Sequence, residues 1–102
     1  MPHLADINAA KYTPEVVAAL LDGYSDAAKS VILSEADIWR YGDVESAKHT
    51  YDETRDWARI LTPDQRDFHR WGAWHANNLL KCAAIREVAT ELGDEWTKPE
   101  AV

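Results

Sequence analysis

The sequence predicts an all-α protein, built as an up-down-up bundle of three long helices that a second copy completes as a homodimer. Three observations predict this class. Apolar residues recur with helical spacing over 13–41, 43–61 and 62–92. Residues that start or stop helices bound each stretch, and only short turns connect them. We therefore expect a helical domain over 13–92, preceded by an N-terminal arm (1–12) and followed by a C-terminal tail (93–102).

The first helix is predicted to begin at Thr13, because a threonine N-cap followed by Pro14 at the first helical position is a strong start signal. It is predicted to run to Tyr41 and to stop at Gly42. Gly23 lies inside this stretch and is a possible break. However, the apolar residues on both sides of Gly23 fall on one arc when counted at about 100° per residue. We therefore expect one long helix that bends at Gly23.

The second and third helices have clear starts. Asp43 is the predicted N-cap of an amphipathic helix over 44–61. Thr62-Pro63-Asp64-Gln65 combines an N-cap, a proline and a capping-box glutamine, and this helix should end at Leu92 with Gly93 as its cap. Its apolar arc, about 200° wide, is wide enough to cover two neighbouring helices.

The predicted helices have unequal lengths of about 42, 27 and 45 Å. The start of the first helix and the end of the third should therefore extend beyond the shorter second helix, and both ends are apolar. Exposed apolar patches of this kind usually mark an interface, which predicts a two-fold dimer. The predicted dimer contacts are Val17, Leu20, Leu21, Ile85, Val88 and Leu92.

Charge and composition exclude several classes of partner. The chain has 18 acidic and 11 basic residues, a net charge of −7, and its bases are scattered among acids. Direct binding to nucleic acid or to an anionic membrane is therefore disfavoured. No apolar run is long enough to span a membrane, and the N-terminus lacks a secretory pattern. Together with the single cysteine, Cys82, this predicts a cytoplasmic protein.

Four polar residues occupy positions where the helical pattern calls for apolar ones: Glu35, Tyr51, His75 and Asn78. In the predicted bundle, Glu35, Tyr51 and His75 lie at similar heights, about 9 to 10 Å from the turn at Gly42. A buried polar layer usually fixes helix register, and this is the interpretation we favour. The alternative is an acid–base or ligand-binding site with perturbed protonation.

The sequence predicts no metal site and no cofactor. His75 and Cys82 share an arc but lie seven residues apart, about 10 Å along a helix, which one ion does not bridge. Glu45 and His49 are four residues apart, but no further ligands accompany them. No phosphate-binding glycine loop or nucleophile motif occurs.

These observations favour a non-enzymatic, acidic interaction protein that binds a protein partner or assembles with itself. The chain has five tryptophans, and tryptophan is frequent at binding hot spots. We expect a partner contact at Trp74 and its polar neighbours Arg70, Asn77 and Lys81. One alternative is a small enzyme or ligand-binding protein that uses the Glu35, Tyr51 and His75 layer. Another is an acidic inhibitor that imitates nucleic acid.

Overall fold

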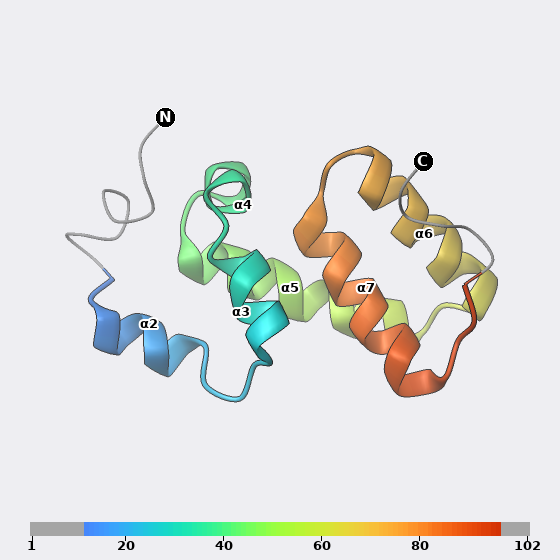
Figure 1. Ribbon diagram of the computed structural model, residues 1–102, viewed down its shortest axis with the longest axis horizontal. Coiled ribbons are helices and arrows are strands. Elements are labelled where there is room, and N and C mark those ends of the chain that lie inside the picture. Colours follow the sequence, from blue (N-terminus) through green and yellow to red (C-terminus); the bar gives the residue numbers. More distant parts are fainter. Residues whose placement is uncertain (1–11, 97–102) are drawn as a thin grey trace. The chain divides into compact units, whose positions relative to one another are not determined.

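The computed structural model describes residues 12–96, and this range contains helices and turns but no strand (Figure 1). The all-α prediction is confirmed for the described residues. The helices are α2 (Pro14–Leu20), α3 (Asp26–Ile32), α4 (Glu35–Tyr41), α5 (Val44–Arg59), α6 (Pro63–His75) and α7 (Leu79–Leu92). Within residues 12–96, the first and third predicted helices are each divided, whereas the second corresponds to α5 and ends slightly earlier than predicted.

The predicted helix starts are confirmed by their capping contacts. The Thr13 side chain accepts a hydrogen bond from the Val16 amide, and Asp43 accepts one from the Ser46 amide. Thr62 forms the predicted capping box, with reciprocal hydrogen bonds between Thr62 and the residue three positions later. At the other end of the chain, Gly93 ends α7 in the left-handed conformation, with φ 73°.

The prediction of one helix over the first stretch is wrong, because this stretch forms α2, α3 and α4. The first break follows Leu21, and Gly23 adopts φ 84°, a value that a helix interior does not contain. Ser25 then caps α3 by accepting a hydrogen bond from the Ala28 amide at 3.1 Å. A second break lies at Leu33 and Ser34.

The prediction of one helix over 62–92 is also wrong, because α6 and α7 are separate. Asn77 adopts φ 54°, which asparagine tolerates better than most residues. Asn78 then caps α7, its side-chain oxygen accepting a hydrogen bond from the Lys81 amide at 3.2 Å. The two asparagines therefore turn the chain where the apolar periodicity alone predicts a continuous helix.

The chain divides into two compact units, Met1–Thr50 and Tyr51–Val102. In the N-terminal unit α3 packs against α4, and the hydroxyl of the buried Tyr12 donates to Glu45 at 3.3 Å. In the C-terminal unit α6 packs against α7. There, Ala58, Ile85 and Val88 form a buried cluster, and Trp96 packs against it. The first residues of the predicted tail therefore contact the helices.

Candidate interaction groove

A buried ion pair connects the ends of the three helical segments in the C-terminal unit. Arg66, in the first turn of α6, donates from Nε to Asp94 at 2.5 Å and from Nη2 to the same carboxylate at 2.9 Å. Its Nη1 also donates to the carbonyl of Ala58 in α5 and to that of Leu61 in the turn after α5. The hydrogen bonds and the positive charge of Arg66 lower the pKa of Asp94 below its ordinary value. Arg66 is therefore a structural connection between helices.

A second polar cluster joins α5 to α7. The hydroxyl of Tyr51 donates to Glu87 at 2.5 Å, and Arg55 donates to the other oxygen of Glu87 at 3.3 Å. Arg55 also pairs with Asp52 on its own helix at 2.6 Å. These contacts place the buried phenol of Tyr51 in a network of charged side chains from two helices.

The structure gives the predicted polar-layer residues separate roles. Tyr51 is buried as expected, but His75 is exposed at the end of α6, with its ring against Trp71 at 4.3 Å between centroids. Asn78 is the N-cap of α7, and Glu35 is the first residue of α4 and is half-buried. Each of the three helices is continuous over the residues from which the heights were counted. His75 is nevertheless not part of a buried polar layer, because its side chain is exposed.

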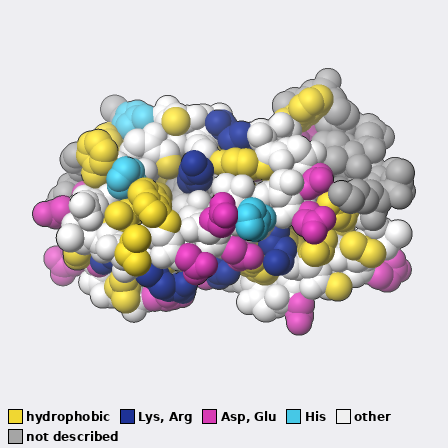
Figure 2. Space-filling view, turned by 180° about the vertical axis from the view of Figure 1, so that it is seen from behind, with side chains coloured by type: hydrophobic (Ala, Val, Ile, Leu, Met, Phe, Trp, Pro, Cys, Tyr) yellow, Lys and Arg dark blue, Asp and Glu magenta, His cyan; other side chains and the backbone are white. Residues whose placement is uncertain are grey.

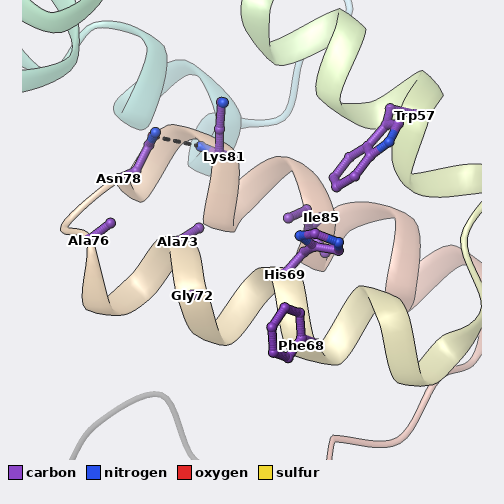
Figure 3. Close-up of a pocket in the computed structure, with 9 residues that line it drawn as sticks. All are labelled: Trp57, Phe68, His69, Gly72, Ala73, Ala76, Asn78, Lys81 and Ile85. Atoms are coloured by element: carbon purple, nitrogen blue, oxygen red, sulfur yellow. Dashed lines mark hydrogen bonds between the residues drawn. The ribbon is translucent and has the colours of Figure 1, made fainter.

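The C-terminal unit has a groove with a volume of about 290 Å³ (Figure 3). It lies along the packed pair α6 and α7, and Trp57 of α5 borders it. Its volume is at the lower limit of small-molecule sites, and it is open to solvent rather than enclosed. We call it the α6–α7 groove. Its lining residues are Trp57, Phe68, His69, Gly72, Ala73, Ala76, Asn78, Lys81 and Ile85.

Three rings form an aromatic cluster at one end of the groove. Trp57 and Phe68 both meet His69 edge to face, at 4.7 Å and 5.4 Å between ring centroids. Figure 3 shows His69 between the two larger rings and beside Ile85. Phe68 is 64% exposed and Trp57 is 40% exposed. In Figure 2, hydrophobic side chains gather beside histidines over the left part of the view, with a basic side chain next to them.

Helical periodicity did not predict this aromatic cluster. It places Trp57 and Phe68 on apolar arcs and His69 on a solvent face, which is typical of two core residues and a surface residue. The wide apolar arc of the 62–92 stretch was no guide to it, because that count combined residues of two separate helices, α6 and α7.

The residues predicted to bind a partner fall into different environments. Lys81 is exposed and lines the groove, and Asn77 is exposed in the turn between α6 and α7. Trp74 is half-buried. Arg70 is fully buried, pairs with Asp67 at 2.6 Å, and lies over the ring of Trp96 at 4.3 Å. Arg70 therefore has no surface to offer a partner.

The residues predicted to form a dimer interface are also divided. Leu21, Ile85 and Val88 are buried within the chain. Val17 and Leu20 are half-buried, and Leu92 is 54% exposed.

The part of the chain that the structure describes shows no further candidate site of the kinds considered next. Between residues 12 and 96, no three His, Cys, Asp or Glu side chains are grouped so that they could hold a metal ion. Cys82 is a buried free thiol. None of the helices in that range has both the length and the apolar character needed to cross a membrane.

Comparison with known proteins identified no relative of this chain. No protein-family model matches the chain, and no curated protein or solved structure is significantly similar to it. Fold and site alone therefore define its class, which is a small all-helical protein with an open, aromatic-rimmed groove.

Proposed function

We propose that this chain is a non-enzymatic interaction protein that binds a protein partner, or a second copy of itself, through the α6–α7 groove. The observation that carries this proposal is the exposure of Trp57 and Phe68 at the rim of a groove. Large aromatic side chains that remain exposed together usually mark a binding surface, and tryptophan is frequent among binding hot spots.

The positions of the polar groups support an interaction role over catalysis. Neither Tyr51 nor His75 lines the groove, and the hydroxyl of Tyr51 already donates to Glu87. The alternative small-enzyme function needs these groups around a cavity that a substrate can enter. The contacts of Tyr51 instead resemble those of a structural network.

The nucleic-acid-mimic alternative has weaker support. It requires a continuous row of carboxylates on the surface of the second predicted helix. Arg55 pairs with Asp52 and Arg59 pairs with Asp56, each three residues away on α5. Such alternation of charges is typical of an ordinary solvated helix face.

Site-specific photo-crosslinking tests the proposal. The photoreactive residue p-benzoylphenylalanine replaces Phe68 in one variant and Ile60 in a control variant. Ile60 is 81% exposed, apolar and in the same unit, but it does not line the groove. Irradiation is carried out in cells that make the protein naturally, and mass spectrometry identifies the adducts.

We expect a discrete protein adduct from position 68 that is weak or absent from position 60. An adduct with twice the mass of the chain identifies a second copy, and any other mass identifies a different partner. The absence of an adduct from position 68, or equal adducts from both positions, would contradict the proposal.

A further inference from the structure

Three polar groups that line the α6–α7 groove have no hydrogen-bond or ion-pair partner among residues 12–96. The Lys81 ammonium makes no ion pair there, and the contacts of His69 are ring contacts with Trp57 and Phe68. The indole N–H of Trp57 likewise has no acceptor in that range. A lysine ammonium and an indole N–H act only as hydrogen-bond donors. The groove therefore presents hydrogen-bond donors to a bound partner.

The charge of the groove is opposite to that of the chain. The chain carries 18 acidic and 11 basic residues, yet none of the residues lining the groove is acidic, and Lys81 is charged. Nearby on α5 the bases are already neutralised, because Arg55 pairs with Glu87 and Arg59 pairs with Glu91. Lys81 is thus an unneutralised positive charge beside an apolar surface, and a carboxylate is its natural complement.

We infer that the partner segment presents a large apolar side chain together with a carboxylate, as on an acidic amphipathic helix. This inference rests on the proposed function and names the chemistry of the partner. Ile85 lies beside the aromatic cluster, and Lys81 is four residues earlier on α7, about 6 Å along the helix axis. An apolar residue and an Asp or Glu three or four positions apart on a helix have the same spacing.

Selection of random peptides displayed on phage tests this inference and does not require the partner to be identified first. The full-length protein is immobilised, and peptides are selected against the natural chain, Phe68→Ser and Lys81→Glu. Lys29→Glu is the control, because it makes the same change of charge in the N-terminal unit. Circular dichroism and thermal unfolding verify that each variant remains folded.

We expect the peptides enriched on the natural chain to combine a large apolar residue with Asp or Glu three or four positions away, and to lose binding to Phe68→Ser. The neutral variant Lys81→Met should weaken their binding by about two- to fivefold, the range of an exposed ion pair. Lys81→Glu should select Lys or Arg instead, and Lys29→Glu should change nothing.

Three results would overturn the inference. Basic or uncharged peptides that still require Phe68 would leave the proposed groove in place but assign it a different partner. The absence of any enriched peptide that depends on Phe68 would also overturn it. Self-association that competes with the peptides would assign the groove to a second copy. Failure of the proposed function is distinguishable from failure of this inference, because only the former removes the crosslink from position 68.

Discussion

Arg66 and Asp94 illustrate how single residues hold the C-terminal unit together. The side chains of both are nearly inaccessible, at 4% and 3% exposure, and Arg66 also donates to the carbonyls of Ala58 and Leu61. A buried ion pair stabilises the fold only when its hydrogen bonds are satisfied. Removal of one partner is strongly destabilising, because it leaves a buried charge without compensation.

Asp94→Asn should therefore lower the free energy of unfolding at neutral pH by about 3 kcal/mol. The matched control is Glu91→Gln, because Glu91 pairs with Arg59 on the surface at 3.0 Å with side chains 43% and 45% exposed. That exposed pair should contribute less than about 1 kcal/mol. Urea denaturation followed by tryptophan fluorescence measures both values, and equal losses would contradict this account of Arg66.

The same pair predicts a pH dependence. Because Arg66 lowers the pKa of Asp94 in the folded state, the pair stabilises the protein fully above the carboxyl pKa of the unfolded chain, about 4. This contribution is lost as the pH falls through the lowered pKa. Urea denaturation of the natural chain and of Asp94→Asn across acidic pH should show a difference in stability that shrinks as the solution is acidified. A difference that stays constant or grows would contradict the assignment.

Among the helices, capping residues decide where each element begins. Thr13, Asp43 and Thr62 were recognisable in the sequence because each stands at the edge of a periodic stretch. Ser25, Ser34 and Asn78 were not recognised, because apolar periodicity continues on both sides of them. Phase continuity does not exclude a break, since a short turn can return the chain to a similar arc.

Serine caps therefore offer a test of the α3 and α4 boundaries. Ser25→Ala should lower the free energy of unfolding by about 1 kcal/mol, because the Ser25 side chain accepts a hydrogen bond from the Ala28 amide. Ser34→Ala should cost much less, because the Ser34 side chain makes no capping hydrogen bond. Chemical denaturation of the two variants measures the difference, and a larger loss for Ser34→Ala would refute this assignment of the caps.

Replacement by alanine should have opposite effects on stability at Gly72, within α6, and at Gly93, which ends α7. Gly72 lies within α6, and a Cβ placed there meets no atom within 4 Å, so Gly72→Ala should stabilise the protein by about 0.5 to 1 kcal/mol. Gly93 has φ 73°, so Gly93→Ala should destabilise it by about 1 to 2 kcal/mol. Thermal unfolding should show shifts of opposite sign, and a shift of the same sign for both would contradict the described backbone.

For the molecule as a whole, the sequence predicted the helical class but not the groove. The positions of Trp57 and Phe68 on apolar arcs indicate burial, and whether a neighbour covers such residues depends on the tertiary packing. Tertiary packing also decides the outcome for two of the predicted dimer contacts. Ile85 and Val88 are apolar, as predicted, but they are buried by their own chain. Lys81 was predicted as a partner contact and does line the groove, but its role in binding stays a prediction.

The proposed function requires that the α6–α7 groove itself binds the partner, and blocking the groove from within is the sharpest test of this requirement. Gly72→Leu places a side chain in the groove at a position where a Cβ has open space, so the helices should keep their structure. In the variant with p-benzoylphenylalanine at position 68, we predict that Gly72→Leu removes most of the partner adduct while circular dichroism and thermal stability are retained. An adduct of undiminished yield from this folded, blocked variant would show that the partner binds elsewhere.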